Sequence, residues 1–339
     1  MPENEAPVVC KRPARLVSLD AFRGATIVAM ILVNNPGRWS KVYPALRHAA
    51  WNGWTLADIV FPFFLFIVGV AVVFSLGSHK ESAAHNGKVL PRVLRRTVIL
   101  CCLGLLLNGF PDYNLADLRI PGVLQRIALC YLAASLIFLH TRVRGQVWIL
   151  AGLLLCYWLM LEFIPVPGVG AGRLEPGKNL PAYIDGLLLP GHLWYNIRPY
   201  DPEGLLSTVP ALATTLFGVL TGHWLRTSWS MRDKAAGMLG SGVLLLVAGQ
   251  IMSIRLPINK GLWTTSFAVF MAGMALVCLA TCFWWLDGKG YRKSAIPFLI
   301  FGTNAVTAYV LSELLSKTLR EIHIPLPDGT KPRLRSYLH

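Results

Sequence analysis

Nine long, mostly apolar runs occupy most of this chain, and polar or turn-forming segments separate them. A helix needs about 20 apolar residues to cross the hydrocarbon core of a bilayer. Glycine and proline inside such runs are tolerated in a membrane. The pattern therefore predicts an all-α fold, a polytopic transmembrane helical bundle with about nine spans. The runs lie near residues 20–39, 56–77, 93–110, 120–139, 146–164, 205–224, 237–254, 263–285 and 296–316.

The distribution of charge supports a membrane protein and predicts its orientation. Only 14% of the residues are charged, whereas soluble domains carry about 25%. The net charge is +15, but the basic residues lie between apolar runs, so we do not expect a nucleic-acid partner. The N-terminus and the alternate loops hold 16 Lys and Arg residues, against nine in the opposite loops. By the positive-inside rule the N-terminus is cytoplasmic, and residues 40–55 and 165–204 face outward.

These features divide the chain into three parts. We expect residues 1–19 to form a cytoplasmic N-terminal segment, residues 20–316 the transmembrane domain, and residues 317–339 a polar C-terminal tail. No cleavable signal peptide is expected, because the first 15 residues are polar. The seven cysteines form no CxxC pair or Cys/His cluster, so no metal site is predicted.

Several charged residues lie inside or beside the apolar runs, where they are costly and usually face the protein interior. Asp20 and Arg23 are three apart in the first run and are expected to pair. Asp201 and Glu203 precede the sixth run and are interpreted as an N-cap and a first-turn acid. Arg126 lies too deep in the fourth run to reach water easily, so it needs an anion. An internal carboxylate and the phosphate of a bound ligand both satisfy that need.

His48 stands outside the second run, and Asp58 lies at the start of that run. Spacing alone is compatible with an ordinary loop histidine and with a catalytic one. From the residues alone, the chain is a polytopic membrane protein with a polar interior. It is an enzyme or a transporter.

Five long stretches carry a more specific resemblance. They are SLDAFRG, RHAAWNGWTLADIVFPFFLFIVG, RIPGVLQRIALCY, YDPEGLLSTVPALATTLFGVLTG and PINKGLWTTSF, in that order between residues 18 and 267. Together they resemble the heparan-α-glucosaminide N-acetyltransferase family, a group of transmembrane acyltransferases. The resemblance implies that cytosolic acetyl-CoA is the co-substrate and that the acceptor is the amine of a terminal glucosamine or similar amino sugar across the membrane. Family members have about eleven spans, so the end of this chain is expected to be truncated or divergent.

The resemblance also implies roles for individual residues. His48, in RHAAWNG, matches the catalytic histidine, and a histidine accepts a proton readily near neutral pH. Asn34 matches an assisting asparagine, with Asn35 as the alternative, and Asp58 matches an aspartate near the same pocket. We expect the phosphates of CoA to be met by cations. The candidates are Arg126, Arg95 and Arg96.

The sequence leaves a second function and several partners to be tested. A transporter or flippase of an envelope glycan or glycolipid shares the polar interior and is the alternative function. The short chain without a signal peptide is interpreted as a bacterial plasma-membrane protein. The expected partners are acetyl-CoA, an amino-sugar or glycan acceptor and the lipid bilayer, and a homodimer is a further candidate assembly.

Overall fold

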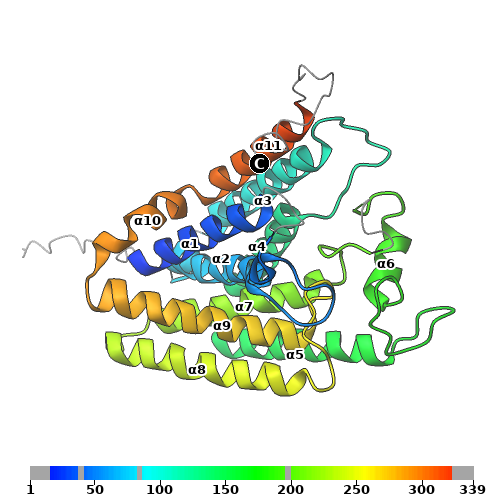
Figure 1. The fold of residues 1–339 in the computed structure, drawn as a ribbon. Helices are drawn as coiled ribbons and strands as arrows, with labels where there is room; N and C mark the ends of the chain where they lie inside the picture. The colour runs from blue at the N-terminus through cyan, green and yellow to red at the C-terminus, as the bar shows by residue number, and fades with distance from the viewer. Residues whose placement is uncertain (1–15, 37–41, 82–85, 195–199, 323–339) are drawn as a thin grey trace, which may run out of the picture.

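The computed structural model describes residues 16–36, 42–81, 86–194 and 200–322, and across these residues it is built of helices without a β-strand (Figure 1). Most of the long helices pack side by side as a bundle, with the short helix α6 on loops beyond one end. The α-helices are α1 (Val17–Asn34), α2 (Leu56–Glu81), α3 (Asn86–Gly109), α4 (Val123–His140), α5 (Val143–Phe163), α6 (Leu180–Leu188), α7 (Thr208–Leu225), α8 (Met231–Met252), α9 (Thr265–Phe283), α10 (Ile296–Thr303) and α11 (Ala305–Glu321).

The all-helical prediction is confirmed, but the prediction of nine spans is not. In the part of the chain that the structure describes, six helices are long and apolar enough to cross a membrane, and a bent pair raises the number to seven. The six are α1, α2, α4, α5, α8 and the helical stretch from α9 to Gly288. All nine apolar runs form helices, so the difference lies in the length and polarity of three of them.

A local feature explains why each of these three runs does not form a single continuous span. Helix α3 carries Arg92, Arg95 and Arg96 in its first half, and charged side chains are costly in hydrocarbon. Helix α7 has four threonines and a histidine among its 18 residues, which lower its hydropathy. The last run is broken at Asn304, where α10 and α11 meet at a bend of 71°.

The helices differ in how much of their surface is covered. In α2 and in the α9 span, 72% of the most apolar window is buried, against 22% in α5 and α8. Helices α2 and α9 therefore form the centre, and α5 and α8 turn apolar side chains outward. An exposed apolar surface of this kind fits contact with lipid. On α8 it includes Leu239, Val243, Leu244, Val247 and Ile251.

Glycines allow the central helices to approach closely. A Cβ atom at Gly69 of α2 would lie 1.9 Å from the carbonyl oxygen of Thr215, and one at Gly218 of α7 would lie 2.0 Å from that of Phe66. Only glycine fits at such contacts, and small residues serve the same purpose in other membrane bundles. The backbones of α2 and α7 are therefore in direct contact.

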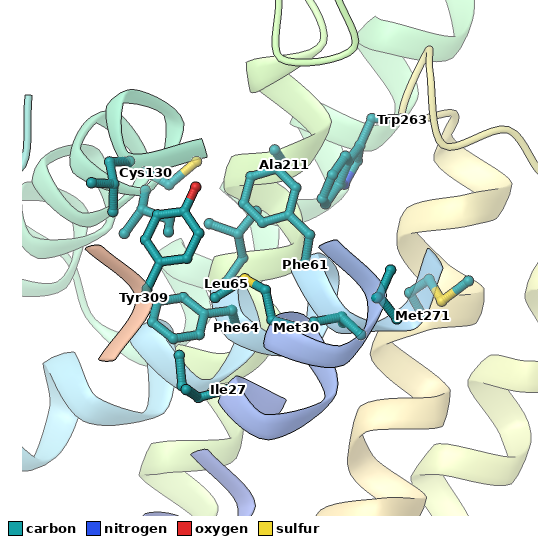
Figure 2. Close-up of a cluster of buried hydrophobic side chains, with 14 of the residues drawn as sticks. Ile27, Met30, Phe61, Phe64, Leu65, Cys130, Ala211, Trp263, Met271 and Tyr309 are labelled. Carbon is teal, nitrogen blue, oxygen red and sulfur yellow. The ribbon is translucent and has the colours of Figure 1, made fainter. Parts of the chain in front are cut away.

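A large apolar cluster joins α1, α2, α3, α4, α7, α9 and α11, and Figure 2 shows its centre. Its members come from segments far apart in the sequence, so it fixes the positions of the helix ends that carry the site. They include Ile27, Met30, Phe61, Phe64, Leu65, Cys130, Ala211, Trp263, Met271 and Tyr309.

The loops expected on one side of the membrane meet at one end of the bundle. Gly53 N–H donates to the Ile258 carbonyl at 2.7 Å, and Ile120 N–H donates to that of His192 at 3.0 Å. The Trp51 indole N–H donates to the Leu174 carbonyl at 3.0 Å. Residues 42–55, 164–194, 200–207 and 253–264 therefore form one continuous surface, which we call the site end.

The boundary predicted at residue 316 falls inside α11, which continues to Glu321. Lys317 donates to the carbonyls of Leu107 and Phe110, at the end of α3. A lysine at a helix C-terminus satisfies carbonyls that lack an intrahelical partner. The remainder of the predicted tail, residues 323–339, lies outside the described residues, as does most of the predicted segment 1–19.

Candidate active site at one end of the bundle

Asp58 lies in the first turn of α2 and its carboxylate reaches back over the start of the helix. Its Oδ2 accepts hydrogen bonds from the backbone N–H groups of Ala49 and Thr55, both at 3.0 Å. A third-position acid that accepts from the residue before the helix is half of a capping box. The Thr-Leu-Ala-Asp sequence therefore explains both where α2 begins and why Asp58 points toward the preceding loop.

The other oxygen of Asp58 holds His48. The distance from His48 Nδ1 to Asp58 Oδ1 is 2.7 Å, short as expected of a charge-assisted hydrogen bond. The Asp58 side chain is 1% exposed and that of His48 is 42% exposed. The carboxylate is thus fixed inside the protein, whereas the imidazole is open to a molecule arriving at the site end.

Lys260 completes the cluster and was missed by sequence reasoning. Its Nζ lies 3.2 Å from Asp58 Oδ1 and 3.1 Å from His48 Nδ1, although 212 residues separate it from His48 in the chain. Only its place in the stretch PINKGLWTTSF, part of the family resemblance, could have pointed to it. We call His48, Asp58 and Lys260 the polar triad.

The triad defines which ring nitrogen of His48 can act as a base. An ionised carboxylate only accepts hydrogen bonds and an ammonium group only donates them. The shortest contact of Nδ1 is the one to Asp58 Oδ1, at 2.7 Å, and it requires a hydrogen on Nδ1. In this tautomer Lys260 donates to Asp58 Oδ1 and not to Nδ1. This leaves Nε2 as the nitrogen with a free lone pair, and it has no hydrogen bond to any described residue. Such an arrangement suits proton abstraction from a bound nucleophile.

Loop 257–264 carries Lys260 and is held by buried polar groups. The Asn259 amide donates to Asn52 Oδ1 at 3.1 Å, across to the loop of His48. Asn259 Oδ1 accepts from the Leu262 N–H at 2.8 Å, and the Tyr157 hydroxyl donates to the Leu262 carbonyl. These bonds fix the loop to α5 and to residues 51–53, so the position of Lys260 is set by the fold.

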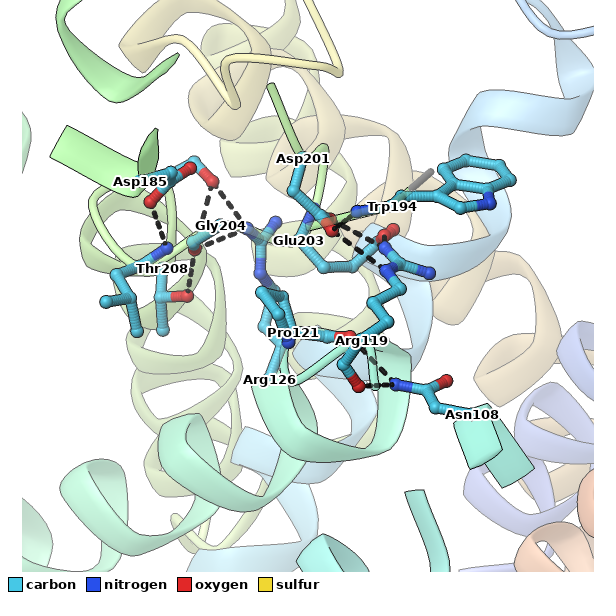
Figure 3. Close-up of polar contacts among 12 residues, drawn as sticks. Asn108, Arg119, Pro121, Arg126, Asp185, Trp194, Asp201, Glu203, Gly204 and Thr208 are labelled. Carbon is cyan, nitrogen blue, oxygen red and sulfur yellow. Dashed lines mark hydrogen bonds and ion pairs between the residues drawn. The ribbon is translucent and has the colours of Figure 1, made fainter. Parts of the chain in front are cut away.

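Arg126 is 1% exposed and supports the same loop from beneath. Its guanidinium lies 5.2 Å from the centre of the Trp263 ring, and Nη2 donates to the Gly204 carbonyl and to Ser207 Oγ (Figure 3). It forms no ion pair with a described carboxylate, and its Nε and Nη1 have no hydrogen-bond partner among the described residues. An internal carboxylate, one of the two anions that the sequence left open, thus forms no ion pair with Arg126 in this part of the chain.

Asp201 and Glu203 do not cap a helix, which corrects the interpretation made from the sequence. Helix α7 begins at Thr208, after Ser207, too far along for a cap by either residue. Both carboxylates instead bind Arg119, with 2.8 Å from its Nε to Asp201 Oδ2 (Figure 3). These two carboxylates raise the pKa of Arg119 against the opposing effect of burial. The result is a firm link between loops 110–122 and 200–207.

Asp185 lies at the end of this network, on α6. Burial raises its pKa from 3.8 to about 6, while a hydrogen bond from Leu205 N–H opposes the shift. Its Oδ2 is buried without a hydrogen-bond partner in the described part of the chain. A buried carboxyl group of this kind prefers the neutral form.

The other predicted site residues lie outside the polar triad. The Asn34 amide donates to Glu313 Oε1 at 3.1 Å, and that of Asn35 donates to the Ile31 carbonyl at 3.0 Å. Neither hydrogen-bonds to His48 in the structure as described. Arg95 and Arg96 are exposed on α3, and the Arg96 guanidinium lies 4.8 Å from the centre of the Tyr131 ring. No group of three His, Cys, Asp or Glu among the described residues has a geometry that could hold a metal ion.

Comparison with known proteins agrees with the resemblance read from the sequence. Residues 15–250 match the family model described as heparan-alpha-glucosaminide N-acetyltransferase, catalytic. The chain belongs to this family. It is 29% identical to heparan-alpha-glucosaminide N-acetyltransferase of Homo sapiens and 30% identical to that of Mus musculus, in each case over 89% of its own length. It spans about half the length of these curated relatives, 53% and 54% respectively.

The family match includes His48, Asp58 and Arg126 but ends before Lys260. The third member of the polar triad therefore lies outside the matched segment, although it contacts two residues within it. The alignments with the two relatives cover more of the chain than the family model does.

Proposed function

We propose that this protein is a membrane-embedded acetyltransferase that moves the acetyl group of acetyl-CoA to the amine of a terminal glucosamine or similar amino sugar. Family membership supports the reaction class. The single observation that carries the mechanism is the polar triad, in which a buried carboxylate orients an exposed imidazole at 2.7 Å. The site end is proposed to face the periplasm, with the N-terminus in the cytoplasm of a bacterial plasma membrane.

In the proposed step, His48 acts as general base. The amine nitrogen attacks the thioester carbonyl carbon, its proton passes to His48 Nε2, and the carbon–nitrogen bond forms as the carbon–sulfur bond breaks. CoA leaves as a thiolate and takes the proton back from the imidazolium. Asp58 stabilises the imidazolium. Lys260 keeps Asp58 ionised, because its positive charge favours the carboxylate form.

Two further roles belong to this proposal. Asn34 Nδ2 carries two hydrogens, of which one is directed at Glu313 Oε1. We assign the second to the oxygen of the thioester, where negative charge develops. Arg126, Arg95 and Arg96 are proposed to meet the phosphates of CoA, and the unpartnered Nε and Nη1 of Arg126 support its part in this.

The test is an assay of acetyl-CoA consumption by purified protein in detergent, with a panel of amino sugars and matched neutral sugars. We expect free thiol and N-acetylated sugar in equal amounts, identified by mass spectrometry. His48→Ala should lower kcat by about 10² to 10⁴, the usual contribution of a general base, with acetyl-CoA affinity retained. A transporter or flippase would release no thiol with any acceptor, and that result would exclude the proposed reaction.

A further inference from the structure

A cavity lies at the opposite end of α2 from the polar triad. Its volume is about 390 Å³, and it is formed where the end of α2 meets the end of α7 and the junction between α4 and α5. The 22 residues from Asp58 to Lys80 rise about 33 Å at the helical repeat, which is close to the hydrocarbon thickness of a bilayer. The lining residues are Gly77, Lys80, Phe138, Arg142, Val143, His223 and Arg226. We call this the basic pocket.

The lining of the basic pocket is cationic. It contains one lysine, two arginines and a histidine, and none of its described lining residues is acidic. Lys80 Nζ donates to the carbonyls of Phe138 and Thr141 at 2.5 and 2.6 Å, which holds its charge at the wall. The Arg226 guanidinium lies over Gly77, where a Cβ would be 1.8 Å from its Nη1. The charges of Lys80 and Arg226 are therefore placed by the fold and not by free side-chain motion.

The start of α5 adds to the attraction for an anion. This helix runs for 21 residues from Val143, and Arg142 at its N-cap makes no side-chain capping bond. The first N–H groups of a helix lack intrahelical partners and carry a partial positive charge, which favours phosphate. Val143 lines the pocket, so the helix start and the basic side chains act on the same space.

The surroundings place the pocket at the depth of lipid headgroups. Trp148 lies one turn into α5 and is 78% exposed, and its neighbour Val147 is also exposed. Trp229 lies just beyond α7 and is 56% exposed. Tryptophans collect at the boundary between hydrocarbon and water. Basic pockets between transmembrane helices at that level bind anionic headgroups.

We propose that the basic pocket binds the phosphate of an anionic phospholipid headgroup at the membrane face opposite the polar triad. The phosphates of CoA fit this position poorly. The pantetheine arm has about as many chain bonds as four to five amino-acid residues, so it extends roughly 15 Å at most. With its thioester at His48, the diphosphate of CoA therefore stops well short of Lys80. A headgroup reaches the pocket directly from the surrounding leaflet.

The test compares two neighbouring arginines. Arg142 is exposed, lines the pocket and makes no side-chain hydrogen bond or ion pair in the described structure, whereas Arg144 is also exposed but lies outside the lining. The binding of phosphatidylglycerol and of phosphatidylcholine to full-length protein in neutral detergent is measured by native mass spectrometry. Arg142→Gln should weaken phosphatidylglycerol binding about fivefold and Arg142→Glu about 25-fold, as expected for one and two charges near an anionic headgroup. Arg144→Gln and Arg144→Glu should leave it unchanged.

Detergent removes the general field of an anionic membrane, so a difference between the two positions reports the pocket itself. Equal losses at both positions, or no preference for phosphatidylglycerol over phosphatidylcholine, would overturn the proposal. The same samples are titrated with CoA. If Arg142→Gln weakens CoA and leaves phosphatidylglycerol unaffected, the pocket belongs to the donor and the lipid proposal is wrong. None of these outcomes depends on whether acetyl transfer is observed.

Discussion

Replacing Asp58 by asparagine separates the two tasks of this carboxylate. Oδ2 accepts from two backbone N–H groups, and Oδ1 faces His48 and Lys260. If the amide oxygen of the asparagine takes the Oδ2 position, both backbone donors stay satisfied and the start of α2 is preserved. The amide nitrogen then faces His48 Nδ1 and donates to it. This favours the tautomer with its hydrogen on Nε2, so a smaller fraction of His48 has Nε2 free to accept a proton.

The size of the effect follows from the bond that is lost. Hydrogen bonds to charged groups contribute about 1.5 to 3 kcal/mol, which corresponds to a 10- to 150-fold change in rate. His48 is 42% exposed, so water can offset part of the loss and the lower half of the range applies. We therefore expect Asp58→Asn to lower kcat by about 10- to 50-fold, less than His48→Ala, with little change in the KM for acetyl-CoA.

The assay is initial-rate thiol release together with a melting curve for each variant. Asp233→Asn is the matched control, because Asp233 occupies the same position in the first turn of α8 and pairs with the N-cap residue Ser230. Asp58→Asn should lose more stability, because Asp58 is buried and Asp233 is exposed, and only Asp58→Asn should lose activity. Wild-type kcat in a folded Asp58→Asn protein would refute the tautomer argument.

Four other changes test separate features. Lys260→Met should lower kcat about 10-fold through loss of one charge-assisted bond to Asp58, whereas Lys260→Arg should retain part of the activity. Arg126→Leu should raise the Kd for acetyl-CoA more than it lowers the melting temperature; unfolding alone would mark a purely structural residue. Asp185 binds its proton more tightly in the folded than in the unfolded protein, so its contribution to the free energy of unfolding is complete below pH 4 and is lost as pH rises through about 6. Asp185→Asn should remove this pH dependence of stability, which amounts to about 3 kcal/mol. Cysteines at Ser40 and Ser78, in a background free of reactive thiols, should be labelled by an impermeant reagent only at Ser40 if the predicted orientation is right.

Much of the fold could be predicted because it depends on local patterns. Each apolar run forms a helix, and the expected pair of Asp20 and Arg23 is present at 3.2 Å. The contact of His48 with Asp58 also spans only ten residues. In these cases the partners lie within one helix or one loop–helix junction, so spacing along the chain limits their separation in space.

The rest depends on tertiary contacts that spacing does not encode. Lys260 reaches His48 because α8 and α9 return their connecting loop to the start of α2. Asp201 and Glu203 had the composition of a helix start, but Arg119 from another loop binds both. The bend between α10 and α11 occurs inside one apolar run, where hydropathy gives no sign of a change in direction.

The cost of burying charge explains why the polar triad lies at a helix end. A carboxylate in hydrocarbon is expensive unless donors and cations surround it. At the start of α2, unpaired backbone N–H groups supply part of that shell, and His48 and Lys260 supply the remainder from loops. The same carboxylate placed two turns further into α2 would face only intrahelical N–H groups that are already bonded. Arg126 lies only one turn from the start of α4, and its guanidinium contacts a carbonyl, a hydroxyl and two aromatic rings there. Chemistry that requires an ionised pair and an open imidazole is therefore confined to the ends of the helices, where the proposed acceptor can arrive from water.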